Sequence, residues 1–231
     1  SGSALPAARR SMSKLRLRYQ TLEFDLDDIH IRTLRDNQQF DDPDGEAEDL
    51  GISSAAWPLF GVLWAAGTVL ADRMWTQDTE GKRILEVGCG IALASIVLNH
   101  RKADITATDR HPEAEAFLRE NARINDDPEI PFVRVGWTDP PSDLGLFDLI
   151  IGSDLLYERA HVEALSDFIE QHAKPVCEVV IIDPGRGESA RFSRRMEGYG
   201  FTVTRESVND PPSEERGFVG HVLSLRRGEA A

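Results

Sequence analysis

The sequence predicts an α/β fold in which a mostly parallel sheet carries helices on both faces. From Ile84 onward, short apolar runs rich in β-branched residues alternate with helical patterns. The last two apolar runs, 201–204 and 218–225, have no helix between them, which predicts an antiparallel hairpin. The third observation is that the first run of the alternating region, 84–87, leads into a glycine-rich turn that opens a helix.

The region before residue 52 predicts a β-hairpin followed by a loop. Polar and apolar residues alternate over 21–26 and again over 29–34, and Asp27 and Asp28 interrupt the alternation. Residues 36–50 are polar and acidic and predict a loop or a short irregular helix.

The apolar stretch 52–70 is long enough to raise the question of a membrane span. Pro58 and Gly61 interrupt it, and a soluble α/β pattern follows directly. We therefore expect a buried helix from about Pro58 to Trp75, with the proline in its first turn.

The alternating region supplies the remaining elements in order. The expected strands before the hairpin are 84–87, 105–108, 132–135, 149–152 and 179–182. The expected helices are one opening at 93–98, one over 113–125, one over 159–172 and one ending near Tyr199. An acidic, proline-rich loop over 208–216 joins the two strands of the terminal hairpin.

The glycine turn after the first strand has the chemistry of a cofactor cradle. Gly88 and Gly90 allow a ligand to lie against the main chain, and the helix behind them leaves unpaired N–H groups. A dinucleotide loop prefers a third glycine where this chain has Leu93, and the lysine of a P-loop is missing. The carboxylate of Glu86 would repel pyrophosphate and suits a ligand with an ammonium group.

This stretch resembles motif I of the seven-β-strand methyltransferases that use S-adenosylmethionine. The family signature is Glu/Asp-x-Gly-x-Gly-x-Gly, and Ala92 replaces its third glycine here. The resemblance implies a Rossmann-like, seven-stranded, mostly parallel sheet of order 3-2-1-4-5-7-6, preceded here by the N-terminal hairpin and helix. It also implies S-adenosylmethionine as cofactor and S-adenosylhomocysteine as product, with Glu86 holding the methionine amino group and Gly88 and Gly90 lying against the cofactor.

Further cofactor contacts are expected where the next strands end. Asp109 can accept the ribose hydroxyls, although a helix cap before His111 would use the same carboxylate. The resemblance places Trp137 against the adenine, with a packed surface tryptophan as the alternative. Asp139 is a second candidate for the adenine amino group. The remaining predicted cofactor-binding residues are Arg110, Ser153 and Trp64, the last of which could equally belong to the core.

The segment after the fourth strand resembles the Asp/Glu-x-x-Tyr/Phe motif of seven-β-strand protein lysine methyltransferases. By this resemblance, Asp154 holds the substrate amine and Tyr157 lines its channel, and these two are the predicted catalytic residues. The run Asp183-Pro184-Gly185-Arg186 looks like a segment of the electron transfer flavoprotein β-subunit lysine methyltransferases and their bacterial relatives, as does Trp57-Pro58 with Trp64. Arg186 is accordingly a predicted substrate residue, or else a solvated turn residue.

The domain expectation is a disordered basic arm over 1–18 and one methyltransferase domain over 19–231. Residues 19–56 form its N-terminal hairpin and loop, and 57–231 its S-adenosylmethionine-binding core. The arm opens on Ser1-Gly2-Ser3, typical of an expression scar, and its basic composition could also be the remnant of a mitochondrial transit segment.

Composition and charge limit the partners. The net charge of −14 argues against nucleic acid as the main partner, because phosphate binding needs clustered Lys and Arg. The two cysteines and six histidines form no disulfide framework or metal pattern, so no metal is expected. We expect a protein substrate, no membrane partner, a monomer, and a reducing compartment, the cytoplasm or alternatively the mitochondrial matrix.

Three functions remain open from the sequence. The first is a protein lysine methyltransferase. The second is a methyltransferase for a small molecule or another protein side chain. The third is a different class, either a cofactor-binding interaction module without turnover or a nicotinamide-binding protein.

Overall fold

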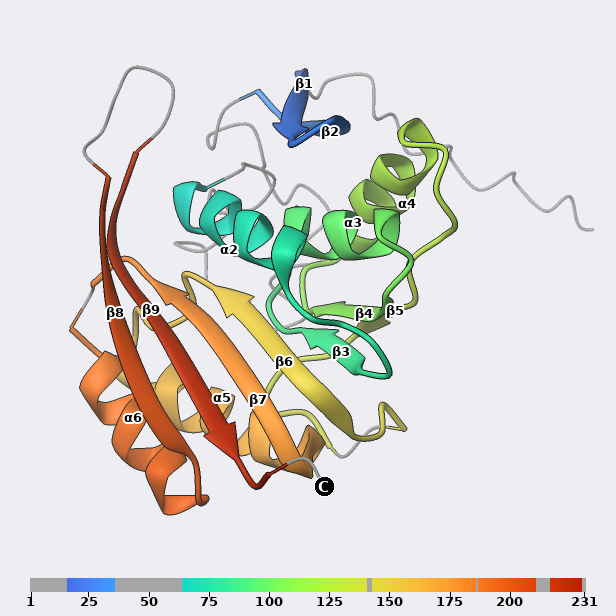
Figure 1. The fold of residues 1–231 in the computed structure, drawn as a ribbon. Coiled ribbons are helices and arrows are strands. Elements are labelled where there is room, and N and C mark those ends of the chain that lie inside the picture. The colour runs from blue at the N-terminus through green and yellow to red at the C-terminus, as the bar shows by residue number, and fades with distance from the viewer. Residues whose placement is uncertain (1–15, 36–63, 141–142, 186, 211–216, 230–231) are drawn as a thin grey trace, which may run out of the picture.

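The computed structural model describes residues 16–35, 64–140, 143–185, 187–210 and 217–229. Its main feature is a seven-stranded sheet of order β5-β4-β3-β6-β7-β9-β8 (Figure 1). Counted from β3, this is the expected order 3-2-1-4-5-7-6, so the predicted fold class is confirmed. A separate two-stranded sheet, β1-β2, forms the N-terminal hairpin.

Five strands run parallel and two complete the sheet as an antiparallel hairpin. The parallel strands are β3 (Arg83–Glu86), β4 (Asp104–Asp109), β5 (Phe132–Arg134), β6 (Phe147–Ser153) and β7 (Ala173–Asp183). The hairpin strands are β8 (Thr202–Asp210) and β9 (Phe218–Arg227), and β9 pairs antiparallel with β7. The carboxyl ends of the parallel strands therefore meet at one edge of the sheet, to which the β6 and β7 arrows point in Figure 1.

Helices cover both faces because successive strand residues point to opposite sides. On β6, Leu149 and Ile151 belong to one core cluster, whereas Ile150 belongs to the other. The first cluster includes residues of α2 (Ala65–Thr76), α3 (Leu93–His100) and α4 (Ala114–Ile124). The second includes residues of α5 (Arg159–His172) and α6 (Ser189–Gly198).

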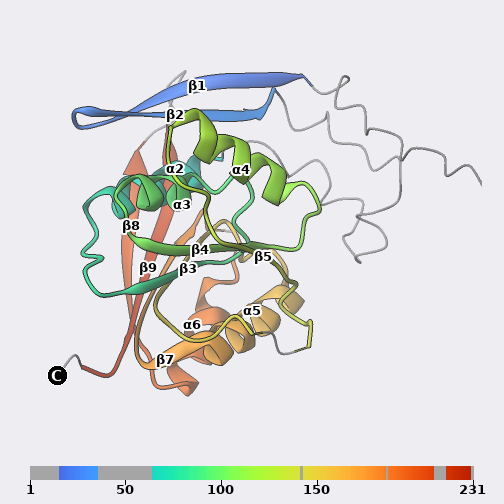
Figure 2. The same ribbon diagram turned by 90° about the vertical axis from the view of Figure 1, so that its right-hand side faces the viewer.

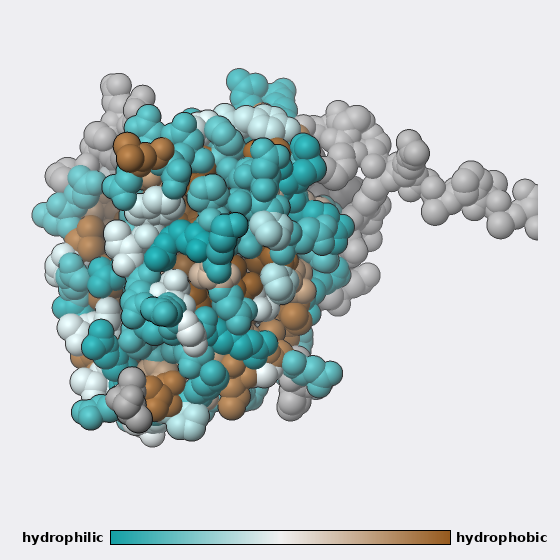
Figure 3. All heavy atoms as spheres, turned by 45° about the vertical axis from the view of Figure 1, so that its right-hand side comes forward, coloured by the Kyte–Doolittle hydropathy of each residue, from teal (hydrophilic) through white to brown (hydrophobic). Residues whose placement is uncertain are grey.

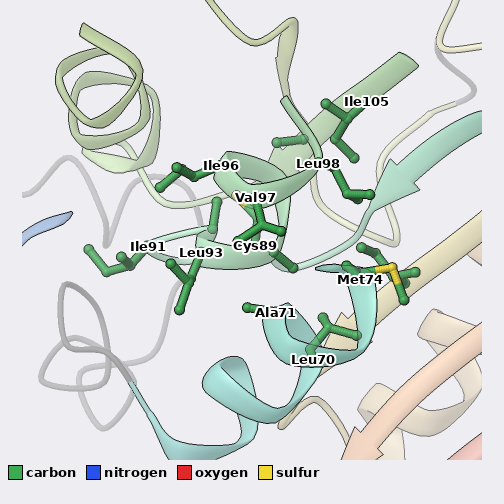
Figure 4. Packing of buried hydrophobic residues seen from close by; sticks show 14 of the residues in the cluster. Leu70, Ala71, Met74, Cys89, Ile91, Leu93, Ile96, Val97, Leu98 and Ile105 are labelled. Carbon is green, nitrogen blue, oxygen red and sulfur yellow. The ribbon is translucent and has the colours of Figure 1, made fainter. Parts of the chain in front are cut away.

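Helices α2 and α3 pack closely and carry the glycine turn on a rigid base. In Figure 4, Leu70, Ala71 and Met74 of α2 lie beneath Cys89 and Val97 of the turn and of α3. All five side chains are buried, and the small Ala71 lets the two helices approach.

The N-terminal hairpin is attached to the domain through helix α4. Its strands are β1 (Leu17–Phe24) and β2 (Asp27–Leu34), which lie across α4 in Figure 2. The buried amide of Asn121 accepts a hydrogen bond from Arg32 N (2.6 Å) and donates one to Arg32 O (3.0 Å). Asn125, one turn later, makes the same pair of bonds with the backbone of His30, both at 2.7 Å. Two side-chain amides thus take the place of a neighbouring strand.

Several predicted boundaries are corrected by the structure. Helix α2 begins at Ala65, and Trp64 before it has extended backbone, so a continuous helix from Pro58 to Trp75 is wrong at Trp64. Strand β1 begins at Leu17, so the predicted arm over 1–18 extends two residues too far. Strand β8 continues to Asp210, into the loop expected over 208–216, because its partner β9 extends the ladder to Phe218.

Other expectations fall on residues that the structure does not describe. They concern the arm over 1–15, the segment 36–63 with Trp57 and Pro58, Arg186, and the loop at 211–216.

Within the described ranges, none of the helices is long and apolar enough to cross a membrane. The face in Figure 3 is mostly hydrophilic, with hydrophobic residues in small separate groups. Cys89 and Cys177 are both free and buried. Among the described residues, no group of three or more His, Cys, Asp or Glu side chains could hold a metal ion.

Candidate functional site

Four carboxylates lie at the carboxyl ends of four neighbouring strands. Asp109 ends β4, Glu86 ends β3, Asp154 follows β6 and Asp183 ends β7. In an open parallel sheet, ligands bind outside these ends where the strand order reverses, which here is between β3 and β6. The site is therefore bounded by two carboxylates on either side of the reversal.

The turn after β3 has left-handed backbone at three alternate positions. The φ angles are 56° at Gly88, 53° at Gly90 and 61° at Ala92. A Cβ atom built on Gly88 would lie 2.6 Å from Leu155 Cδ2 and 3.3 Å from Trp137 Cζ2, so a larger residue would have the strained conformation and would also displace the end of the Leu155 side chain. At Gly90 nothing lies within 4 Å of such an atom, which leaves open space beside the turn.

Asp109 joins the glycine turn to the end of β4. Its Oδ2 accepts a hydrogen bond from Gly90 N and its Oδ1 accepts one from His111 N, each at 2.8 Å. Burial raises the pKa of Asp109, and these backbone bonds oppose the shift. A carboxylate has about four acceptor positions, so Asp109 can make both backbone bonds and still accept from a ligand. The alternative role as a helix cap is not found, because Glu113 is the N-cap of α4 and Asp109 bonds His111 N outside that helix, whereas the ribose role stays a prediction.

Glu86 is buried beside the first turn of α3. Its Oε1 accepts from both Ser95 N (3.1 Å) and Ser95 Oγ (2.6 Å). Burial raises the pKa of the Glu86 carboxyl from its ordinary 4.5 to about 7, against the effect of the Ser95 bonds and with a smaller contribution from the charge of Asp109. Glu86 is thus fixed in position and sensitive to any positive charge brought beside it.

A cluster of three ring-bearing side chains lies next to the glycine turn. The rings of Trp137 and His161 meet edge-on at 6.0 Å, and those of His161 and Tyr157 at 5.1 Å. Burial raises the pKa of Tyr157 and lowers that of His161, and Arg110 is among the smaller electrostatic influences on both. The structure therefore brings together Trp137, Tyr157 and Arg110, which were predicted separately.

The turn after β6 folds back onto the glycine turn. Asp154 has φ 53°, and its N–H donates to Ile182 O of β7 at 2.9 Å. This conformation directs the following chain back, so that the side chain of Leu155 lies against Gly88 and Gly152. The segment predicted to bind the substrate and the segment predicted to bind the cofactor are therefore in contact through Leu155.

The other predicted residues occupy different parts of the site. Ser153 is the last residue of β6 and is half-buried. Trp64 precedes α2 with 37% of its surface exposed, and its carbonyl accepts from Gly67 N and Thr68 N. Asp139 is exposed and accepts from Gly136 N at 2.6 Å. The cofactor and substrate roles of all these residues stay predictions.

Sequence reasoning missed Ser95, His161 and the isolation of Asp183. Ser95 is completely buried and is the one polar residue in the apolar run 93–98, a signal that could have identified it. His161 lies in the first turn of α5, which begins at Arg159, and its ring meets that of Tyr157, which precedes the helix. Both carboxylate oxygens of Asp183 are buried without a hydrogen-bond partner within the described part of the chain, and nothing in the sequence indicates this.

Comparison with known proteins finds several methyltransferase relatives. Protein N-lysine methyltransferase METTL21A of Danio rerio is 33% identical over 128 residues, which are 51% of this chain and 58% of that protein. Histone-arginine methyltransferase METTL23 of Xenopus laevis is 29% identical over 44% of this chain and 46% of that protein. The electron transfer flavoprotein beta subunit lysine methyltransferase of Xenopus laevis is 26% identical over 68% of this chain and 64% of its own length. The chain spans about half the length of the first relatives it matches.

Solved structures share the fold at low sequence identity. The T. thermophilus 16S rRNA methyltransferase RsmC aligns with a TM-score of 0.63 at 10% identity, over 93% of this chain and 51% of that one. A precorrin-6y methyltransferase of Geobacter metallireducens aligns with a TM-score of 0.55 at 18% identity, over 71% and 87%. The family model described as lysine methyltransferase matches residues 49–197, well over half of the chain. Those residues include the glycine turn, Asp109 and the Asp154–Tyr157 turn, and the chain belongs to the lysine methyltransferase family.

Proposed function

We propose that this chain is a methyltransferase that uses S-adenosylmethionine to N-methylate lysine side chains of a protein substrate. The observation that carries the proposal is the contact between the glycine turn and the Asp154–Tyr157 turn. Leu155 lies against Gly88, so a ligand on the glycine turn and a side chain held by Asp154 would be neighbours. Family membership and the named lysine methyltransferases among the relatives support the substrate class.

The residues present fit the cofactor. The open space beside Gly90 gives the main chain room to contact a ligand, as a cofactor cradle requires. Glu86 would hold the cationic amino group, which would favour the ionised form of a carboxyl whose pKa burial has raised to about 7. Asp109, already fixed by Gly90 N and His111 N, would accept the ribose hydroxyls.

The cofactor supplies an activated methyl group, so the protein's contribution is mainly to position the acceptor. Asp154 would attract and orient the substrate ammonium, since lysine has a reference pKa of about 10.4 and arrives protonated. Tyr157, backed by His161, would form the apolar side of the channel. Asp154 also stabilises the unreactive ammonium form, so the proton must be removed elsewhere.

The net charge of −14 is consistent with a cationic protein segment as partner and offers no general attraction for nucleic acid. We place the reaction in a reducing compartment, the cytoplasm or alternatively the mitochondrial matrix, in keeping with two free, buried thiols. We also take the chain to act as a monomer and without a membrane.

The test is transfer of labelled methyl groups from S-adenosylmethionine into cell lysate, separated afterwards into protein and small-molecule fractions. Asp154→Asn runs in parallel, with S-adenosylhomocysteine binding measured for both proteins. We expect label on lysine in a discrete protein, lost in the variant while binding is retained. Label in small molecules or on arginine would replace the substrate class, and equal turnover by the variant would remove the role of Asp154.

A further inference from the structure

Asp183 is the least satisfied charged group at the carboxyl edge of the sheet. It is 1% exposed, and neither of its carboxylate oxygens has a hydrogen-bond partner among the residues that the structure describes. The other fully buried carboxylate of the site, Glu86, is held by Ser95. Burying a carboxylate without a partner costs several kcal/mol, so such a group needs an explanation.

The position of Asp183 places it beside the substrate segment. Ser153 pairs with Ile182 in the β6–β7 ladder, and Asp154 N donates to Ile182 O, so Asp154 and Asp183 occupy adjacent strand ends. Neighbouring strands are separated by about 4.8 Å. The two carboxylates therefore belong to the same part of the site.

The face of the sheet supports the same placement. Val179 and Ile181 belong to the core cluster beneath α5 and α6, and alternation puts Asp183 on that face too. Leu155 and Leu156 also belong to this cluster. The turn carrying Asp154 and Tyr157 thus folds onto the side of the sheet where the Asp183 carboxylate lies.

We propose that Asp183 is the proton acceptor for the substrate's cationic amine, beside which Asp154 acts as the orienting carboxylate. This inference rests on the proposed methyl transfer to an amine. It gives the unpartnered carboxylate a partner at the moment when substrate enters, and it supplies the proton acceptor that Asp154 alone does not provide.

The step balances as follows. One N–H bond of the substrate ammonium breaks, its proton forms an O–H bond with Asp183, and the electron pair stays on nitrogen. The amine then forms the C–N bond while the donor's S–C bond breaks, leaving that electron pair on sulfur. Burial favours the neutral amine and neutral carboxyl over the ion pair they replace, because desolvation penalises charge.

The groups around Asp183 that could share its proton come from several elements. His221 of β9 lies directly opposite Asp183, and Ser207 Oγ of β8 approaches His221 Nδ1 at 3.5 Å. Other ionisable groups on the elements around this end of the sheet include Asp154 after β6, His161 of α5, and the Glu188–Arg191 ion pair at the start of α6.

The test compares the pH dependence of wild type and Asp183→Asn. The probe is labelled S-adenosylmethionine with lysate protein at one sub-saturating concentration, so that initial rates follow kcat/KM. In the wild type, the bound ammonium passes its proton to Asp183, so turnover does not depend on the small fraction of amine deprotonated in solution, and we expect a nearly flat rate from pH 7.5 to 9.5. The variant can use only amine deprotonated in solution, so its rate should be about 1,000-fold lower at pH 7.5 and rise about tenfold per pH unit.

Thermal unfolding provides a readout independent of turnover. Asp183→Asn removes an unpaired buried charge, so its Tm should equal or exceed that of the wild type. S-adenosylhomocysteine binding should be unchanged. Asp104→Asn, an exposed carboxylate at the opposite end of β4, is the matched control and should match the wild type throughout.

Each remaining outcome overturns the proposal. Equal rates, or parallel pH profiles, would show that Asp183 does not accept the proton. A Tm several degrees lower would show that the carboxylate has a stabilising partner in the folded protein. If the wild type transfers no label, the proposed function fails with it, whereas a labelling wild type with an unaffected variant refutes Asp183 alone.

Discussion

The raised pKa of Glu86 predicts that the protein without ligand loses stability as the pH rises through neutrality. The carboxyl ionises near 4.5 in the unfolded chain and near 7 in the folded protein, because it is buried. Between these values the folded state binds the additional proton, so the contribution of Glu86 to the free energy of unfolding is greatest below pH 4.5 and is lost as the pH rises towards and through 7. At 1.36 kcal/mol per pKa unit, the difference amounts to about 3 kcal/mol.

Glu86→Gln isolates this contribution, because the amide keeps the shape of the side chain and does not titrate. We expect the wild-type Tm to fall by several degrees more than the variant's between pH 5 and pH 8, measured by calorimetry in matched buffers. S-adenosylhomocysteine, through its ammonium group, should restore much of the loss at pH 8 in the wild type and little in the variant. Parallel Tm profiles for the two proteins would refute the reasoning, since other groups would then account for the whole pH dependence.

Two further predictions use matched pairs of substitutions. Gly90→Ala should lower the free energy of unfolding by about 1–2 kcal/mol, because the alanine must adopt left-handed backbone. Ala92 has the same conformation, so the variant should still fold. Its Cβ would fill the open space beside the turn, so S-adenosylhomocysteine binding should weaken at least about tenfold in a titration. Gly88→Ala should destabilise more, since its Cβ would also meet Leu155; equal stabilities would contradict this. Asn121→Ala should lower the free energy of unfolding, measured in urea, by about 2–3 kcal/mol. The substitution leaves the buried N–H and C=O groups of Arg32 without their hydrogen bonds to the Asn121 side chain. Asn125→Ala, whose bonds are open to water, should cost less than about 1 kcal/mol, and the reverse order would refute the comparison.

The order and type of the sheet elements could be predicted because the alternating pattern repeats at every strand. The helix over 159–172 was located to the residue, and the strand order followed from motif I and the terminal hairpin. The positions at which strands begin and end were harder to predict from the sequence. Strand β7 begins at Ala173, six residues before the expected run, because Ala173 pairs with Phe147 of β6, and Cys177 and Glu178 pair with β9.

Single residues of the site could be predicted from the sequence, but the residues that they contact in the folded protein could not. Glu86, Asp109 and Asp154 stand out because an acidic residue next to an apolar strand is visible in the sequence. Ser95 lies nine residues beyond Glu86, and only the folding of α3 against β3 makes it a partner. Similarly, the contact of Leu155 with Gly88 depends on left-handed backbone at Asp154. This conformation is uncommon for a residue other than glycine, so the sequence does not predict it.

The two halves of the carboxylate row differ in a way that bears on the order of binding. On the β3–β4 side, Glu86 and Asp109 already have protein partners, so a cofactor meets groups held in place. On the β7 side, Asp183 has no hydrogen-bond partner among the described residues, and under the proposed function a substrate cation would supply one. A preorganised half binds its ligand without further ordering, whereas the other half would gain stabilisation only from substrate. If the proposed methyl transfer holds, this asymmetry favours cofactor binding first and acceptor binding second, so that the substrate amine would enter a site in which the methyl donor is already positioned.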